Sequence, residues 1–346
     1  MSRIAVVGTA FGMRIQVPAL REAGFEVVAL VGQDPEKTAR RAERLGTQPA
    51  TSLTEALEFG LDAVAIATPP MTHAPLATEA LTAGCHVLLE KPFTNDVAEA
   101  EALVATAAAS GKAAVIGHEF RFAPSQALVA RVLASGAIGE PRLVLHHSVM
   151  GMLRQFEFPA WWYDPAQGGG WLNASGSHRL DALRQWFGDV VRVSATFPST
   201  ASVPLGVEDA FSLRLSLDGG IDAELLQAAS AVGTGVHDTR IIGTEGTIVI
   251  DGEEVRLETT AGTEIVAVPE ELALPDVEHL VRGSLADMTR VELQPAVAQA
   301  RAFLGLIEGR GPGPVEPATF ADGLATTRVI AAARRSATEG GAWISL

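Results

Sequence analysis

Residues 4–13 read IAVVGTAFGM, four apolar residues followed by a turn that contains two glycines. In dinucleotide-binding folds the first strand leads into G-x-G-x-x-G, where backbone N–H groups and a helix N-terminus meet the pyrophosphate. The match is incomplete, because Ala10 and Met13 stand at the second and third glycine positions and Gly12 lies one residue early. The strand-like run before the turn and the helical pattern after it favour a dinucleotide-binding loop over an ordinary strand-to-helix turn. The residues predicted to form it are Gly8, Ala10, Phe11 and Gly12.

Outward from this stretch, apolar runs alternate with helix-like stretches as far as about residue 120. The runs cover 4–7, 27–31, 63–67, 87–89 and 113–116, and the helix-like stretches cover about 14–22, 35–45, 74–83 and 96–110. Near-continuous apolar strands that alternate with helices are typical of a parallel sheet covered on both faces. We therefore predict an α/β Rossmann domain with a doubly wound parallel sheet over residues 1–122.

The pattern changes from residue 123 onward. A helix is predicted near 125–135, strands at 211–217 and 221–225, a hairpin at 247–250 and 254–257, and helices at about 294–308 and 319–336. Alternating strands that are closed by glycine turns indicate antiparallel hairpins with one buried face. Residues 123–346 are therefore predicted to form an α+β domain with a mostly antiparallel open sheet, for substrate binding and oligomerisation. The sequence leaves open whether the last helices of this domain pack on the first domain.

Composition narrows the class of protein. The 346 residues carry 26 Lys and Arg against 41 Asp and Glu, a net charge of −15, which repels nucleic acid and anionic lipid. The single cysteine, Cys85, cannot form an intrachain disulfide, and we expect a cytoplasmic protein without nucleic-acid or membrane partners. Charged residues make up 19%, below the roughly 25% typical of soluble domains, which favours a homodimer or homotetramer.

The end of the second predicted strand bears on the choice of dinucleotide. NAD-binding folds commonly place an acidic residue there, which bonds the adenosine ribose. Here Gly32 and Gln33 stand at that point, before an Asp34-Pro35 helix start, so no acid repels a 2′-phosphate. Three basic residues follow on the next helix, either as a solvated face or as phosphate ligands: Lys37, Arg40 and Arg41. The expected cofactor is NAD or NADP, with a slight lean to NADP.

Two further motifs lie at the carboxyl ends of predicted parallel strands, where open α/β sheets bind ligands. They are A-T-P-P-x-x-H at residues 67–73 and Glu90-Lys91-Pro92. With both motifs in this order, the chain resembles the glucose-fructose oxidoreductase / inositol dehydrogenase / MocA (Gfo/Idh/MocA) family over nearly all of its length. The resemblance implies cofactor contacts from Thr68, Pro69, His73, Glu90 and Lys91.

The same resemblance implies a catalytic role for Lys91, at the nicotinamide end of the cofactor. A positioned ammonium there stabilises the charge that develops on an alcohol oxygen during hydride transfer. Without the family context, a strand-end Glu90–Lys91 pair would be an ordinary surface ion pair. Arg121, in a segment that resembles the family's R-F-x-P junction, is expected to face the substrate, with a structural anchor as the alternative.

A glycine-rich segment over residues 168–181, GGGWLNASGSHRLD, resembles the family's G-G-G-x-L-x-D-x-G-x-H. The resemblance places His178 at the catalytic histidine and Ala174 where the family commonly has a catalytic aspartate. Asn173 is a polar neighbour of Ala174, but adjacent residues of a regular helix point about 100° apart, so Asn173 is not expected to replace the aspartate. Asp181, three residues after His178 and on the same helix face, is predicted to orient the imidazole or contact substrate.

Aromatic residues gather beside this segment. Four of the five tryptophans and the only tyrosine are Trp161, Trp162, Trp171, Trp186 and Tyr163. Aromatic rings suit the apolar C–H faces of sugars, so Trp162 and Trp171 are predicted substrate contacts, with core packing as the alternative. The sequence shows no metal-ligand spacing and no Ser-His-Asp pattern.

Together, these observations and the resemblance predict an NAD(P)-dependent oxidoreductase. It would transfer hydride between nicotinamide and a secondary alcohol or ketone of a sugar, cyclitol or related polyol. The alternative is a non-catalytic sensor or regulatory protein of the same fold, which binds dinucleotide and ligand but has lost turnover with the carboxylate at position 174.

Overall fold

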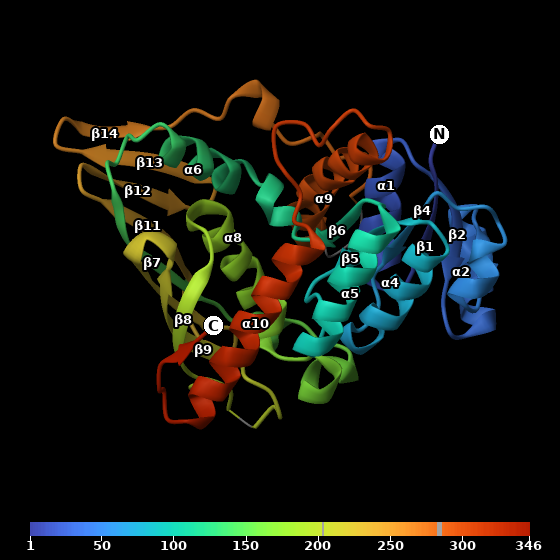
Figure 1. Ribbon diagram of the computed structural model, residues 1–346, viewed down its shortest axis with the longest axis horizontal. Helices are drawn as coiled ribbons and strands as arrows, with labels where there is room; N and C mark the ends of the chain where they lie inside the picture. The colour runs from blue at the N-terminus through green and yellow to red at the C-terminus, as the bar shows by residue number, and fades with distance from the viewer. Residues whose placement is uncertain (203, 282–285) are drawn as a thin grey trace. The chain divides into compact units, whose positions relative to one another are not determined.

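The computed structural model describes residues 1–202, 204–281 and 286–346. The chain forms two compact units, Met1–Ala123 with Ala273–Leu324, and Pro124–Leu272 with Ala325–Leu346 (Figure 1). The first border lies next to the predicted boundary between residues 122 and 123. The prediction assigned everything after residue 122 to the second domain, whereas the segment 273–324 belongs to the first unit. Its helix α9 (Ala286–Ile307) packs there against α1 and the 3-10 turn η3 (Glu119–Phe122).

A six-stranded parallel sheet forms the centre of the first unit, in the order β3-β2-β1-β4-β5-β6. The strands are β1 (Arg3–Val7), β2 (Glu26–Val31), β3 (Gln48–Ala50), β4 (Ala63–Ile66), β5 (His86–Glu90) and β6 (Ala114–Gly117). The strand order reverses between β1 and β4, as in a doubly wound sheet. The predicted parallel α/β sheet is confirmed, and the three-residue β3 is an addition.

Helices cover this sheet on both faces. They are α1 (Val17–Ala23), α2 (Pro35–Leu45), α3 (Leu53–Leu57), α4 (His73–Thr82), α5 (Val97–Ser110) and α9. Side chains of β1 alternate between two separate cores: Ile4 and Val6 pack with Phe303 of α9, whereas Ala5 and Val7 face the core that includes Leu103 of α5. Both faces of the strand are therefore buried, which explains its uninterrupted apolar sequence.

The second unit contains a nine-stranded sheet in the order β14-β13-β12-β11-β7-β10-β9-β8-β15. The strands are β7 (Pro141–Val149), β8 (Val190–Thr196), β9 (Ala210–Leu217), β10 (Ile221–Ala228), β11 (Val236–Gly243), β12 (Gly246–Asp251), β13 (Glu254–Thr259), β14 (Gly262–Ile265) and β15 (Ile344–Ser345). All neighbours pair antiparallel except β7 with β10, which are parallel. The prediction of a mostly antiparallel sheet is confirmed.

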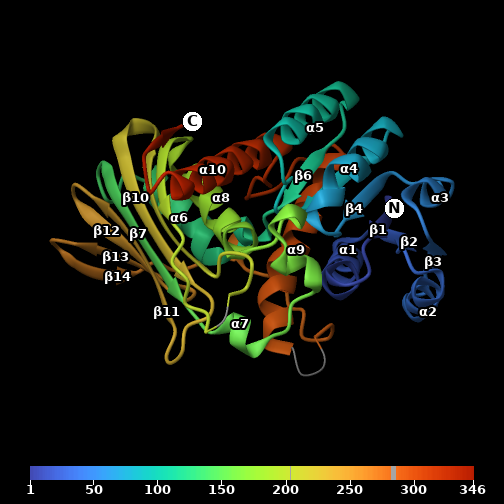
Figure 2. The same ribbon diagram turned by 90° about the horizontal axis from the view of Figure 1, so that it is seen from below.

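One face of this sheet packs against helices, as Figure 2 shows. They are α6 (Pro124–Ala134), α8 (Ser177–Phe187) and residues 325–338 of α10 (Phe320–Thr338), whereas the short α7 (Met152–Gln155) follows β7. Their side chains, among them Leu128, Leu180 and Val329, form one apolar core with the inner residues of β7 to β13. This core fixes α8, the helix that carries His178.

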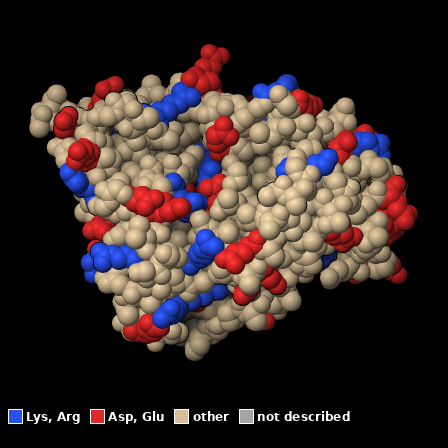
Figure 3. Space-filling view, in the orientation of Figure 1, with Lys and Arg blue, Asp and Glu red and all other residues tan. Residues whose placement is uncertain are grey.

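Two surface properties bear on partners. On the face drawn in Figure 3, Lys and Arg side chains are interspersed with Asp and Glu, so this face offers no basic field to a polyanion. Among the described residues, no helix combines the length and the apolar character that a membrane crossing requires.

Candidate functional site

The turn after β1 can accept only glycine at its first position. Gly8 has φ +117°, and a Cβ there would lie 2.2 Å from the Ala67 carbonyl oxygen, while its N–H donates to the Val31 oxygen over 3.0 Å. A Cβ on Gly12 would lie 2.9 Å from Val6 Cγ1. The turn therefore lies tightly against β1 and β4 and leaves its outer side to a ligand, the arrangement that admits a pyrophosphate. A π-turn, η1 (Gly12–Gln16), leads from it into α1, where a regular helix was expected.

Position 32 has no space for an acidic side chain. A Cβ on Gly32 would lie 2.5 Å from Thr38 Oγ1 and 2.6 Å from Thr9 Cγ2. The Arg41 guanidinium donates from Nη1 to Thr9 Oγ1 over 2.5 Å, next to the glycine turn. Arg40 instead pairs with Glu36 on the exposed face of α2, at 3.7 Å. Of the basic residues on α2, Arg41 is thus the one that the structure holds at the predicted ribose end.

The predicted cofactor contacts after β4 and β5 are joined by one buried histidine. His73 Nδ1 lies 2.9 Å from the Pro92 carbonyl oxygen, and Nε2 lies 2.9 Å from the Thr68 oxygen. Burial lowers the pKa of His73, against the raising effect of its backbone carbonyl partners, and so favours the neutral imidazole, which has one N–H and donates to one of the two segments at a time. His73 therefore lies between the segments of Thr68 and Lys91, and its direct contact with a cofactor stays a prediction.

Three largely buried carboxyl groups interact electrostatically with Lys91, and we refer to Glu90, Glu119 and Glu292 as the carboxyl cluster. They come from the end of β5, from η3 and from α9. Gln16 donates to Glu90 Oε1, and Arg14 Nη1 lies 2.8 Å from Glu292 Oε2. A Cβ at Gly117 would lie 2.7 Å from Glu90 Oε2, so this glycine provides the space for the carboxyl group.

Burial raises the pKa values of all three carboxyl groups of the cluster. Burial raises the pKa of Glu90 to about 7, against the lowering effects of Lys91 and Gln16. Burial, followed by the charge of Glu90, raises the pKa of Glu119 well above its usual value. Burial also raises the pKa of Glu292, against Arg14 and Lys91. The positive charge of Lys91 thus lowers the pKa values of all three carboxyl groups. Sequence analysis missed Glu119 and Glu292.

Glu90→Gln is expected to stabilise the protein progressively as the pH rises from 5 to 8. Between the usual pKa of 4.5 and the folded-state value of about 7, the folded protein binds more protons than the unfolded chain, so the stability of the wild type falls with rising pH. Glutamine keeps the acceptor for Gln16 and cannot ionise. Thermal unfolding at several pH values measures the difference in Tm, with the exposed Glu43→Gln on α2 as control. A pH-independent difference would contradict the titration.

Arg121 is anchored within the first unit. Its side chain is buried, and Nη2 lies 3.4 Å from Asp322 Oδ1 at the start of α10. Asp322 also accepts from Thr319 N over 2.7 Å. This geometry favours the structural alternative for Arg121, and its contact with substrate stays a prediction.

The glycine-rich segment of the second unit is shaped by close backbone contacts. A Cβ on Gly169 would lie 2.0 Å from the Trp162 oxygen, and one on Gly170, which has φ +106°, would lie 2.4 Å from Glu208 Oε1. The segment continues into a π-turn, η6 (Leu172–Gly176), in which the Ser177 N–H donates to the Leu172 oxygen. Such turns are frequent at functional sites.

This π-turn changes the expected geometry before His178. In a π-turn the N–H of residue i donates to the carbonyl of residue i−5, so the turn is one residue wider than in a regular helix. Asn173 as well as Ala174 therefore lies about one turn before His178, whereas a regular helix would place only Ala174 there. Asn173 is buried and donates from Nδ2 to the Gly168 oxygen over 2.9 Å. His178 and Asp181 are both buried on α8, three residues apart, as the predicted orienting pair requires.

The two predicted substrate-binding tryptophans are both buried in the core of the second unit. Trp162 is 3% exposed and packs against Phe158 in a tilted arrangement and against Tyr163 edge to face, with ring centroids 4.8 and 5.1 Å away. This favours the core-packing alternative for Trp162. Trp171 is 4% exposed, but its Nε1–H has no acceptor among the described residues. Trp171 therefore retains a donor for a ligand.

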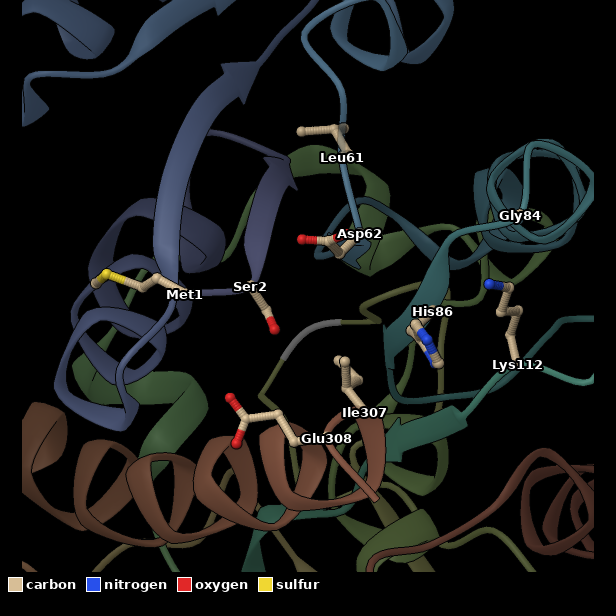
Figure 4. Close-up of a pocket in the computed structure, with 9 residues that line it drawn as sticks. All are labelled: Met1, Ser2, Leu61, Asp62, Gly84, His86, Lys112, Ile307 and Glu308. Atoms are coloured by element: carbon tan, nitrogen blue, oxygen red, sulfur yellow. The ribbon is translucent and has the colours of Figure 1, made fainter. Parts of the chain in front are cut away.

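A separate hollow of about 400 Å³ opens at the opposite edge of the first sheet (Figure 4). Asp62 and His86, which line it, stand where β4 and β5 begin, and both already accept backbone hydrogen bonds, from Arg3 and Ala113. Ligands of open α/β sheets bind at the carboxyl ends of strands, so we place the site at Gly8, Thr68 and Lys91 instead. No metal-binding group of three or more His, Cys, Asp or Glu occurs in the described part of the chain.

The reversal of strand order beside a tight glycine turn defines a Rossmann-type nucleotide-binding protein. Comparison with known proteins agrees: residues 2–118 match the oxidoreductase family with an NAD-binding Rossmann fold, and residues 127–249 match the GFO/IDH/MocA C-terminal domain. The chain belongs to the GFO/IDH/MocA oxidoreductase family, as its motifs predicted.

Relatives match both parts of the chain. The uncharacterized oxidoreductase sll0816 of Synechocystis sp. is 29% identical over 269 residues, 73% of this chain and 72% of that protein. A solved aldose-aldose oxidoreductase from Caulobacter crescentus, complexed with glycerol, is 25% identical with a TM-score of 0.81 and covers 100% of this chain and 99% of its own. Levoglucosan dehydrogenase in complex with NADH and levoglucosan, at 21% identity, matches the fold with a TM-score of 0.86 over 99% of both chains.

Proposed function

We propose that this protein is an NAD(P)-dependent dehydrogenase or reductase that acts on a secondary alcohol or ketone of a sugar, cyclitol or related polyol. The observation that carries the proposal is Lys91, held beside a buried carboxyl cluster at the same sheet edge as the glycine turn. The family match to an NAD-binding domain and the likeness to an aldose-aldose oxidoreductase support it.

The residues that would hold the dinucleotide are those of the turn, Gly8, Ala10, Phe11 and Gly12, with Gly32 and Gln33 at the ribose end. When bound, the nicotinamide supplies the acceptor or donor of hydride. Lys91 stabilises negative charge on the substrate oxygen, and the His178 imidazole takes or gives the hydroxyl proton, with Asp181 holding its orientation. Incubation with NAD⁺ or NADP⁺ and a panel of sugars and cyclitols tests the function, because formation of reduced nicotinamide is directly observable.

The second candidate, a non-catalytic sensor, is favoured by one observation. Ala174 brings no carboxyl group to the turn before His178, and Asn173 uses its amide on Gly168. Tight dinucleotide and sugar binding without reduced nicotinamide on any member of the panel would favour this reading over the enzyme.

Arg41→Gln is expected to weaken NADP(H) binding by about 10-fold and to leave NAD(H) binding nearly unchanged, because a guanidinium beside Thr9 can bond a 2′-phosphate. Calorimetric titration with both cofactors measures this. Arg40→Gln, on the exposed face of α2, is the matched control. If the wild type binds NAD(H) but fails to bind NADP(H) even at millimolar concentration, the lean to NADP is wrong.

Trp171→Phe is expected to raise KM for the preferred sugar by about 10-fold while Tm stays near that of the wild type, because the change removes a buried N–H but keeps the aromatic body. Trp162→Phe serves as control, and its effect should fall on Tm. A Trp171→Phe enzyme with unchanged KM would remove this residue from the substrate site.

A further inference from the structure

The inner face of the second sheet changes from apolar to polar along its central strands. Val144, Ala223 and Ile241 belong to the core, but the inner-face positions at the far ends of β7, β10 and β11 are polar, and all of them are buried except His237, which is exposed. We refer to these side chains as the polar patch: His146, Ser148, Gln227, His237 and Thr239. Strand register places them side by side, with Thr239 opposite His146, and His237 and Gln227 opposite Ser148.

Hydrogen bonds connect the polar patch internally. His146 Nδ1 lies 2.8 Å from Thr239 Oγ1, and its Nε2 lies 3.0 Å from Gln227 Nε2, which donates to it. His237 Nδ1 lies 3.2 Å from Ser148 Oγ, and the two imidazole rings meet edge to face at 5.5 Å. Gln227 is 1% exposed, yet its Oε1 has no partner in the described structure. The patch therefore retains one buried acceptor.

The charge of Arg179, on α8, acts on two histidines of this patch. Burial lowers the pKa of Arg179 to about 10, so its guanidinium remains charged at neutral pH. Burial and then the charge of Arg179 lower the pKa values of His146 and His237, which favours neutral imidazoles. His147 and His237 act on His146 in the same direction, whereas Asp238 and Asp251 raise the pKa of His237.

The Arg179 guanidinium has neither an ion pair nor a hydrogen bond within the described part of the chain, although Arg184 on the same helix pairs with Asp189 at 2.6 Å. The Arg179 side chain is partly buried, and the five N–H groups of its guanidinium match the oxygens of a carboxylate or phosphate. Arg179 thus offers donors and Gln227 an acceptor, on a helix and a strand that contribute to the same core of the second unit.

We propose that Arg179 and the polar patch bind a polyol ligand that carries an anionic oxygen group, a carboxylate or a phosphate. The guanidinium donates to the anionic oxygens, and Gln227 Oε1 accepts from a ligand hydroxyl. Arg179 directly follows His178 on α8, and adjacent helical residues point about 100° apart, so the two side chains reach different parts of one ligand. If this ligand is the substrate of the enzyme, that part of the inference rests on the proposed function, whereas the inference of anion binding does not.

The test is calorimetric titration of the NAD⁺-loaded protein with three matched probes, glucitol, gluconate and glucitol 6-phosphate. We expect at least one anionic probe to bind about 10-fold or more tightly than glucitol, and which one binds tells carboxylate from phosphate. Arg179→Gln should weaken that binding by about 10- to 100-fold, and Arg179→Lys should weaken it less. Arg184→Gln, which removes a paired arginine of the same helix, should leave it unchanged.

The thermal stability of Arg179→Gln distinguishes a binding role of Arg179 from a structural one. Because Arg179→Gln removes an unpaired charge, its Tm should equal or exceed that of the wild type, whereas a structural arginine would lower it. Equal affinity of the wild type for glucitol and both anions overturns the inference without any variant, and so does full anion binding by Arg179→Gln. Anion binding through Arg179 without reduced nicotinamide would contradict the proposed function alone. Oxidation of glucitol with no preference for anions would contradict the anion site alone.

Discussion

Lys91→Ala is expected to lower kcat by about 100-fold or more, comparable to the loss of one oxyanion-stabilising donor. The ammonium stands at the carboxyl end of β5, where charge develops on the substrate oxygen in the proposed reaction. Because this interaction strengthens in the transition state, kcat should fall more than KM rises. Steady-state kinetics with the preferred polyol measures both.

The carboxyl cluster adds a second consequence of the same substitution. Lys91 lowers the pKa values of Glu90, Glu119 and Glu292, so its removal favours their protonated forms. Stability of the Ala variant should therefore fall more steeply with rising pH than that of the wild type. Kinetics are best measured near pH 6, where the variant remains folded.

Two controls separate the catalytic role from this electrostatic one. Lys91→Arg keeps the positive charge in the cluster and places it differently, so it should restore the pH dependence of stability but not full turnover. Lys112→Ala removes a lysine at the opposite edge of the same sheet and should change neither. A Lys91→Ala enzyme with near-wild-type kcat would exclude Lys91 from the mechanism.

The sequence predicts the fold because each core leaves a local signature. β1 is apolar at successive positions since Ile4 and Ala5 enter different cores, and β9 alternates since only one of its faces is buried. The strand β3 was missed because three residues, Gln48–Ala50, form no periodic pattern. The π-turns η1 and η6 were also missed, because hydrophobic spacing does not distinguish one wider turn from a regular helix.

The candidate site is less predictable, because its contacts join distant parts of the chain. Lys91 and His178 are found through short motifs, but Glu292 reaches the site by packing of α9, more than two hundred residues after its partner Arg14. No local pattern encodes that contact. Trp162 and Trp171 occur in the same aromatic stretch and are equally buried, and what distinguishes Trp171 is a buried Nε1–H without an acceptor among the described residues, which no sequence pattern reveals.

His178→Ala is expected to lower kcat by about 10²- to 10⁴-fold, the usual contribution of a positioned acid or base. Imidazole is the side chain best suited to exchange protons near neutral pH, and Asp181 on the same helix face can hold its orientation. The acidic limb of the pH profile of kcat/KM should disappear in the variant. His279→Ala, on the surface of the first unit, is the control and should retain the wild-type profile.

Ala174→Asp distinguishes the two candidate functions. If His178 is sufficient as acid and base, the missing carboxylate only positions substrate and tunes the imidazole, so the variant should keep or increase the wild-type kcat. The π-turn places both position 174 and Asn173 about one turn before His178, so Asn173→Ala tests whether the amide already supplies part of that positioning. Turnover that appears only in Ala174→Asp would mean that the wild type is the sensor. Turnover in the wild type that survives His178→Ala would mean that another group moves the proton and that the glycine segment is misaligned with the family motif.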